Sequence, residues 1–171
     1  MRSGRRLAML AVALVALGQS HARAQAQEPQ GVVMQRILSL EAAKTIAQAA
    51  LEACTSRGFH TSVAVVDRAG NLLVLLRDEQ SNPATIDMAR GKAYTALVFR
   101  GPTSEFQKAT ASDPTRAPQR DVPGILALGG GVPITVGNEI IGAVASSGSN
   151  QTADDECARA GLAKAEALLK P

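Results

Sequence analysis

The fold is decided by residues 126–148, LALGGGVPITVGNEIIGAVASSG, which hold two short β-branched runs on either side of a turn. The runs Val132–Val136 and Ile140–Val144 flank Gly137–Glu139, whose residue types favour a tight turn. The pattern therefore predicts a β-hairpin. Three glycines, Gly129–Gly131, precede the hairpin. They permit either a sharp turn or a backbone cradle for an anion, and the sequence leaves both interpretations open.

A second hairpin is predicted upstream, with strands at Ser62–Asp67 and Leu72–Arg77 joined by residues 68–71. Both faces of the first strand are apolar, which indicates a central strand that is covered on both sides. Asp67 stands where the turn begins. We therefore favour a role as a turn acceptor for Asp67 over a role in function.

Helical periodicity surrounds and separates the two hairpins, which indicates an α+β fold. The first helix has Ser39 as its cap and Gly58 as its stop. An irregular excursion with three prolines covers residues 111–124. The remaining expected elements are a helix from Pro83 or Thr85 to about Phe99, a short helix after Gly101-Pro102, a short strand at Ile125–Leu128 and a last helix from about Ala153.

Residues 1–24 have the three parts of a secretory signal peptide. Three arginines stand among the first six residues, Leu7–Leu17 is apolar, and Ala22-Arg23-Ala24 fits the small-x-small cleavage rule. We expect cleavage near Ala24, a mature start near Gln25 and a periplasmic or secreted protein. Residues 25–37 are expected to be a flexible lead-in to a single domain at residues 38–171. No later stretch is long and apolar enough for a membrane span.

The basic character of the chain belongs mostly to the leader. The full chain carries 18 basic and 15 acidic residues, and residues 1–24 hold four of the arginines and no acid, so the mature chain has a net charge of −1. No basic face remains for nucleic acid. Two cysteines, Cys54 and Cys157, are left in a chain bound for an oxidising compartment, and either a bridge or two buried thiols would fit.

Several kinds of catalytic site are absent from the sequence. His60 is the only histidine after the leader, and the chain has no Gly-x-Ser-x-Gly elbow and no P-loop. Asp154, Asp155 and Glu156 are consecutive, and consecutive residues of a helix point about 100° apart. We expect these acids to stabilise a helix N-terminus rather than to converge on a metal ion.

A set of motifs, in this order, resembles the GlcG/HbpS-like family, also called the haem-binding or haem-degrading HbpS-like domain. The resemblance covers about residues 38–169. It implies a profilin-like α/β/α sandwich with a five-stranded antiparallel sheet, and an assembly of identical subunits. It also places the first and last helices together, which would allow a Cys54–Cys157 disulfide. The motifs are Ser62–Gly70, Arg77, Gly91–Ala96, Gly129–Ile134, Ile141–Val144, Ser147–Gly148 and Asp155–Ala158.

The family includes haem-binding extracellular sensors, so the resemblance implies a haem or other tetrapyrrole ligand. Such a ligand needs an apolar slot, an axial ligand and cations for its propionates. His60 or Tyr94 would be the axial ligand, and Arg77 and Lys92 would meet carboxylates. The site would lie where Gly129, Gly130 and Gly131, with uncovered amides, approach these side chains.

Each candidate also has a purely structural interpretation. His60 would be a solvated residue at a strand entry, and Tyr94 would contribute packing. Arg77 and Lys92, embedded between apolar runs, would form ion pairs with carboxylates such as Asp67 or Asp87.

The family also contains glycolate-operon proteins, which gives a different function. The chain would then be an accessory protein or enzyme of small hydroxy-acid metabolism, or a small-ligand-binding oligomeric module without catalysis. No general base has a clear partner in the sequence, so a binding protein is favoured over a catalyst.

Overall fold

A computed structural model describes residues 31–170. The chain divides into two units, Met1–Met34 and Gln35–Pro171, and the elements described below belong to the second. The predicted signal peptide, residues 1–24, lies outside the described residues. Among the described helices, none combines the length and the apolar character that a membrane span requires.

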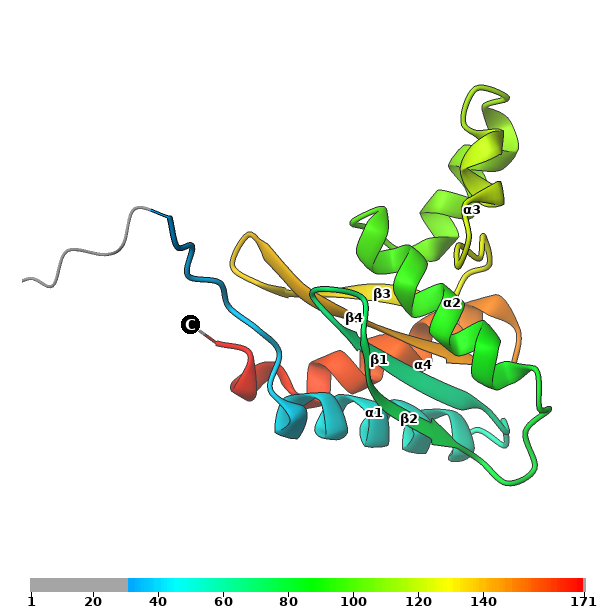
Figure 1. Cartoon of the computed structure of the whole chain (residues 1–171). Coiled ribbons are helices and arrows are strands. Elements are labelled where there is room, and N and C mark those ends of the chain that lie inside the picture. The colour runs from blue at the N-terminus through cyan, green and yellow to red at the C-terminus, as the bar shows by residue number, and fades with distance from the viewer. Residues whose placement is uncertain (1–30, 171) are drawn as a thin grey trace, which may run out of the picture. The chain divides into compact units, whose positions relative to one another are not determined.

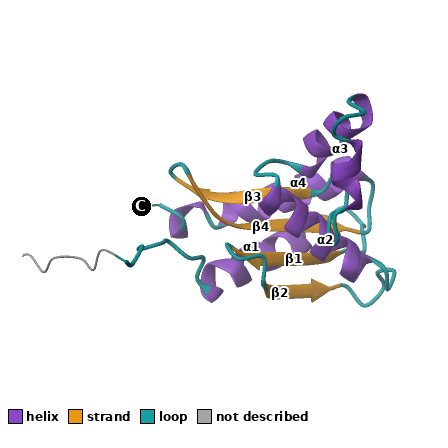
Figure 2. Ribbon diagram, turned by 45° about the horizontal axis from the view of Figure 1, so that its top comes forward, coloured by secondary structure: helices purple, strands orange, loops and turns teal. Residues whose placement is uncertain are grey.

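The second unit is built on one antiparallel sheet of four strands (Figure 2). The strands are β1 (Ser62–Asp67), β2 (Leu72–Arg77), β3 (Gly131–Val136) and β4 (Glu139–Ser147). Their order is β2-β1-β4-β3, so the two predicted hairpins lie side by side and β1 is central, as its apolar faces indicated.

The fifth strand that the resemblance implied is not found among the described residues, and the strand expected at Ile125–Leu128 is a loop. Its backbone is tied to a helix instead of a strand, because the amide of Leu126 donates to Oγ1 of Thr95 at 2.7 Å. A loop held in this way needs no strand partner.

Helices cover both faces of the sheet, which makes the α/β/α sandwich (Figure 1). On one face, α1 (Leu40–Thr55) and α4 (Gln151–Lys164) pack together. On the other face, α2 (Thr85–Val98) brings alanines against Val66 of β1 and the alanines of β1 and β4. Small side chains let that helix lie close to the sheet. The remaining elements are α3 (Thr103–Ser112) and two short 3-10 helices, Ala117–Asp121 and Glu166–Leu168.

Side-chain oxygens fix the turn and the helix starts. Oδ1 of Asp67 accepts the amides of Ala69 and Asn71, which confirms its role as the turn acceptor. The cap of α1 is Ser39, as expected. The last helix begins two residues before the predicted Ala153, because Asn150 caps it and accepts the amide of that residue.

A disulfide between Cys54 and Cys157 joins α1 to α4, with 5.5 Å between the Cα atoms. This confirms the pairing that the resemblance implied. Both cysteines are fully buried, and the bond links positions 103 residues apart in the chain. Gly161 supports the contact, since a Cβ there would lie 2.9 Å from the Cβ of Ala50 on the facing helix.

Removing this bond tests how much the cross-link stabilises the fold. We expect the double variant Cys54→Ala/Cys157→Ala to lose about 4–5 kcal/mol of unfolding free energy, because a loop of about 100 residues is released in the unfolded chain. Urea unfolding of oxidised wild type, reduced wild type and the variant measures the loss. Equal free energies for the oxidised wild type and the variant would contradict it.

Candidate functional site

One end of the sheet brings together most of the residues predicted for the site. Ser62, at the start of β1, pairs with Arg77 at the end of β2 and with Ser147 at the end of β4. His60 precedes β1, and the triglycine leads into β3 beside the last residues of β4. The starts of α2 and α4 lie at the same end (Figure 1).

Lys92, on α2, is buried at this end of the sheet and is 2% exposed. Its Nζ donates to Oδ2 of Asp154 at 2.8 Å and to the carbonyl oxygen of Ser146 at 3.2 Å. The ion-pair interpretation of Lys92 is therefore correct in kind, but the partner is neither Asp67 nor Asp87. The other carboxylate oxygen of Asp154 accepts the amide and the hydroxyl of Ser149.

The three acids at the start of α4 diverge, as the helix geometry predicted. While Asp154 turns inward, Asp155 pairs with Arg159 at 2.7 Å and Glu156 with Arg57 at 2.7 Å. Within residues 31–170, no three His, Cys, Asp or Glu side chains gather to hold a metal ion.

The triglycine fits against this ion pair. A Cβ at Gly131 would lie 2.5 Å from the carbonyl oxygen of Lys92, and one at Gly130 would lie 2.7 Å from Cβ of Asp154. The expectation of uncovered amides is wrong for two of the three glycines. The amide of Gly129 donates to Oε1 of Gln151, and that of Gly131 donates to Oγ1 of Thr103. The glycines thus serve close packing.

A pocket of about 320 Å³ opens above the ion pair, between α2 and the start of α4. Ser146 directs its hydroxyl to Cys54 on the α1 face, so its neighbour Ser147 faces the α2 side and the pocket. Oγ of Ser147 is buried and has no hydrogen-bond partner among the described residues. The lining residues are Asn82, Ala84, Thr85, Met88, Lys92, Leu128, Ser147, Gly148, Ser149, Gln151 and Asp154.

Two donors are therefore available to a ligand in this pocket. An ammonium group has three protons, and Lys92 uses two of them in the bonds described above. The unpartnered hydroxyl of Ser147 is the second donor. Together they are suited to an oxygen atom of a ligand, such as that of a carboxylate or a carbonyl group.

His60 forms a hydrogen-bonded pair with Asp78 at the rim of the same end. Nδ1 of His60 donates to Oδ1 of Asp78 at 3.0 Å, and this oxygen also accepts the amide of Gln80 at 2.8 Å. The hydrogen bond from the Gln80 amide, and next the one from His60, hold the pKa of Asp78 below its usual value. Among the described residues, Nε2 of His60 has no hydrogen-bond partner, and the side chain is 41% exposed.

Sequence reasoning missed Asp78 and Ser147. The position of Asp78 could have been inferred from the sequence. Asp78 directly follows β2, whose last residue pairs with the first residue of β1, and His60 shortly precedes β1. For Ser147 the signal was weaker, because a serine at a strand end is ordinary and only its burial without a partner sets it apart.

Arg77 and Tyr94 differ from their expected roles. Arg77 is exposed, and its guanidinium donates to the carbonyl oxygens of Ser81 and Glu79 rather than to a carboxylate. Tyr94 lies away from the triglycine and packs between two other glycines. A Cβ at Gly70 would lie 2.8 Å from its ring, and one at Gly124 would lie 3.4 Å from it. The packing interpretation of Tyr94 describes this arrangement.

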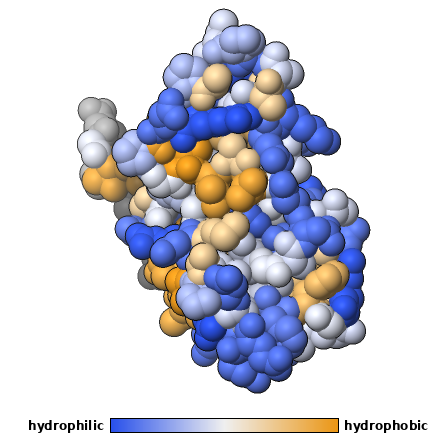
Figure 3. Space-filling view, turned by 90° about the vertical axis from the view of Figure 1, so that its right-hand side faces the viewer, coloured by the Kyte–Doolittle hydropathy of each residue, from blue (hydrophilic) through white to orange (hydrophobic). Residues whose placement is uncertain are grey.

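Hydrophobic surface gathers at this end of the molecule. Figure 3 faces the end at which α2 and α4 begin and shows apolar atoms in the middle, between hydrophilic margins. The half-buried loop Ile125–Leu128 and the 49% exposed Val122 supply apolar side chains ahead of β3, and Met88 extends this surface into the pocket. The arrangement suits a ligand with a large apolar body and polar ends.

The fold is an α/β/α sandwich with a pocket at one end of its sheet, and comparison with known proteins identifies its family. The family model described as "Haem degrading protein HbpS-like" matches residues 38–163. The chain belongs to this family, which confirms the resemblance.

Individual relatives agree with that assignment. A crystal structure of an HbpS double mutant from Streptomyces reticuli is 38% identical with a TM-score of 0.75, covering 90% of this chain and 97% of that one. Protein GlcG of Escherichia coli is 33% identical over 111 residues, which are 65% of this chain and 81% of GlcG. The Klebsiella pneumoniae protein ORFY is 25% identical with a TM-score of 0.77, covering 82% of this chain and 99% of that one.

Because the Lys92–Asp154 pair is buried, breaking it should cost stability. We expect Lys92→Met to lose about 3–5 kcal/mol of unfolding free energy, since it leaves the Asp154 carboxylate without a counter-charge. The double variant Lys92→Met/Asp154→Leu should recover most of this loss. Urea unfolding measures all three proteins. A Lys92→Met protein as stable as wild type would show that the pair contributes little.

Proposed function

We propose that this chain is a haem- or tetrapyrrole-binding protein with His60 as the axial ligand. The observation that carries the proposal is the hydrogen bond from Nδ1 of His60 to Asp78. Histidines that bind a metal nearly always donate their other ring N–H to a carboxylate, a carbonyl oxygen or water. This bond fixes the tautomer and directs the lone pair of Nε2 to the outside, where an iron atom would be held.

The surroundings of His60 favour a macrocycle over a bare metal ion. A bare ion needs several protein ligands, whereas haem brings four nitrogens of its own and needs one or two. An apolar surface lies at the same end of the sheet for the ring. Polar donors for carboxylates also lie there, from the Arg77 guanidinium at the rim to Lys92 and Ser147 in the pocket.

The family description supports the same ligand, because it names haem, and the HbpS relative is the protein after which the family is named. When bound, haem would supply its redox-active iron. The part of this chain would be to bind and orient the ring, and to hold the proton on Nδ1 of His60 so that Nε2 stays free.

Haemin titration followed by absorbance tests the proposal. We expect wild type to shift the Soret band with saturation at one haemin per chain. His60→Ala should lose that shift. Asp78→Asn should weaken haemin binding roughly 10–100-fold, because substituting a residue that hydrogen-bonds a metal ligand typically has an effect of this size. Arg77→Ala should weaken binding by about 1–3 kcal/mol. The matched control is Arg116→Ala, at the residue before the 3-10 helix Ala117–Asp121.

A small hydroxy acid is the second candidate, and the unpartnered Ser147 hydroxyl beside Lys92 is the observation that favours it. Calorimetry with glycolate separates the two functions. Glycolate binding that Ser147→Ala weakens and His60→Ala leaves unchanged, together with a featureless haemin titration, would replace haem with a hydroxy-acid ligand. The chain would then be an accessory protein or enzyme of hydroxy-acid metabolism, or a binding module without catalysis.

We further propose that the protein is exported to the periplasm or beyond. The basic start, the apolar run and the small-x-small site of residues 1–24 support this, as does the disulfide, which persists in oxidising compartments. The intact mass of protein from the periplasmic fraction is expected to begin near Gln25. Full-length chain recovered only from the cytosol would contradict export.

A further inference from the structure

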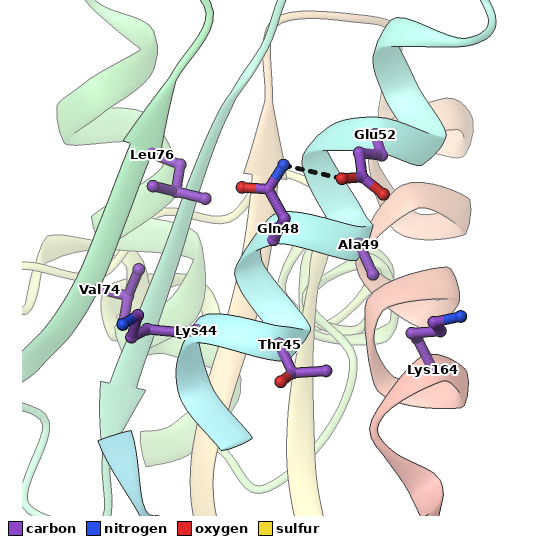
Figure 4. Close-up of a pocket in the computed structure, with 8 residues that line it drawn as sticks. All are labelled: Lys44, Thr45, Gln48, Ala49, Glu52, Val74, Leu76 and Lys164. Carbon is purple, nitrogen blue, oxygen red and sulfur yellow. Dashed lines mark hydrogen bonds between the residues drawn. The ribbon is translucent and has the colours of Figure 1, made fainter. Parts of the chain in front are cut away.

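Two hollows in the described part of the chain differ in what they offer a ligand. A groove of about 480 Å³ lies between α1 and β2. Figure 4 shows its floor, formed by Val74 and Leu76, and the polar side chains of α1 along it. Most of these polar side chains are exposed to water, and none is a buried group without a partner. The pocket above the buried ion pair is smaller, at about 320 Å³, but it holds such a group, the hydroxyl of Ser147.

The carboxylate of the ion pair is already hydrogen-bonded on both oxygens. One oxygen of Asp154 accepts from Lys92 at 2.8 Å, and the other accepts the amide and the hydroxyl of Ser149. Among the described residues that line the pocket, only Lys92 and Asp154 are charged, so the charges of the lining cancel. The pocket is therefore suited to a group of low charge that accepts hydrogen bonds, and a ligand with several charges would gain no net attraction there.

Two amide side chains that line the same pocket, Asn82 and Gln151, add donors. Oδ1 of Asn82 accepts the backbone amide of Ala84 at 2.9 Å, and Oε1 of Gln151 accepts the backbone amide of Gly129 at 2.7 Å. A backbone N–H can only donate, so each of these bonds fixes which end of the side chain is the oxygen. Each NH₂ group is left without a partner among residues 31–170.

We propose that this pocket binds a small 2-oxo acid, such as pyruvate, in preference to the corresponding 2-hydroxy acid. The inference rests on the small-acid function given above as the second candidate, and it deepens that function by naming the class of acid. The carboxylate and the carbonyl oxygen of a 2-oxo acid only accept hydrogen bonds. The pocket supplies four donors for them, from the Ser147 hydroxyl, the Lys92 ammonium group and the two amide side chains.

A 2-hydroxy acid differs at one oxygen, which carries a proton. Each carboxylate and amide oxygen of the lining already accepts a hydrogen bond, so the hydroxyl of the acid would have to share one of them. The oxygen of Ser147 could accept it only in place of a better use of that hydroxyl, which is to donate to the acid. We therefore expect lactate to bind at least about fivefold more weakly than pyruvate, the lower end of the cost of a poorly paired polar group.

Titration calorimetry of the haem-free protein with pyruvate and with lactate tests this preference. The two acids share a carbon skeleton and a charge, so the difference in dissociation constant reports the one oxygen. Ser147→Ala should weaken pyruvate binding about tenfold or more, because it removes a buried donor to a charged group. Ser112→Ala on α3 is the matched control and should bind pyruvate as wild type does.

Reversing a donor at the pocket is the second test. Gln151→Glu keeps an oxygen for the amide of Gly129 and replaces the free NH₂ group with a carboxylate oxygen. It should weaken pyruvate binding, because the new group repels the acid and cannot donate to it. Gln35→Glu, an exposed position before α1, adds the same charge outside the pocket and should leave pyruvate binding unchanged.

The possible results separate this inference from the functions on which it rests. Lactate binding as tight as pyruvate binding would overturn the oxo-acid preference and leave the small-acid function in place. Binding of neither acid would overturn both, and a Soret shift with haemin would then leave haem as the ligand. Pyruvate binding that Ser147→Ala and Gln151→Glu leave unchanged would overturn the assignment to this pocket. Circular dichroism shows that each variant is folded.

Discussion

The buried ion pair between Lys92 and Asp154 is the interaction on which the candidate site depends. It joins α2 to α4, and through the carbonyl oxygen of Ser146 it also joins both helices to β4. Two buried charges are tolerated only if each is paired and hydrogen-bonded, and here nearly every polar atom of the pair has a partner. The ammonium group of Lys92 has three protons and makes two hydrogen bonds among the described residues, and Lys92 lines the pocket.

The close fit around this pair explains the triglycine. A side chain at Gly130 or Gly131 would collide with the ion pair or with the backbone of α2, so those glycines are part of how the charges are sealed from water. The same end of the sheet then offers two different environments. A polar pocket lies over the ion pair, and a half-exposed histidine is held at the rim by Asp78. A ligand with carboxylates and a metal would use both.

Local sequence signals predicted much of the fold. The turn residues at 67–71 and 137–139 located both hairpins, and the apolar faces of β1 showed that it is central. Local signals could not predict which residue pairs with Lys92. Asp154 lies 62 residues away, and the contact depends on the orientation of α4 relative to α2. The loop at Ile125–Leu128 resembled a strand because it is apolar, and only its hydrogen bond to Thr95 shows why it is not one.

If His60 binds haem iron, the position of the iron is the most direct evidence. Crystals grown with haemin, measured at the iron absorption edge, would locate the metal by its anomalous scattering. We predict a single strong peak within bonding distance of Nε2 of His60, with the hydrogen bond between Nδ1 and Asp78 intact. A peak elsewhere in the molecule, or none at saturating haemin, would contradict the assignment of His60 as the axial ligand.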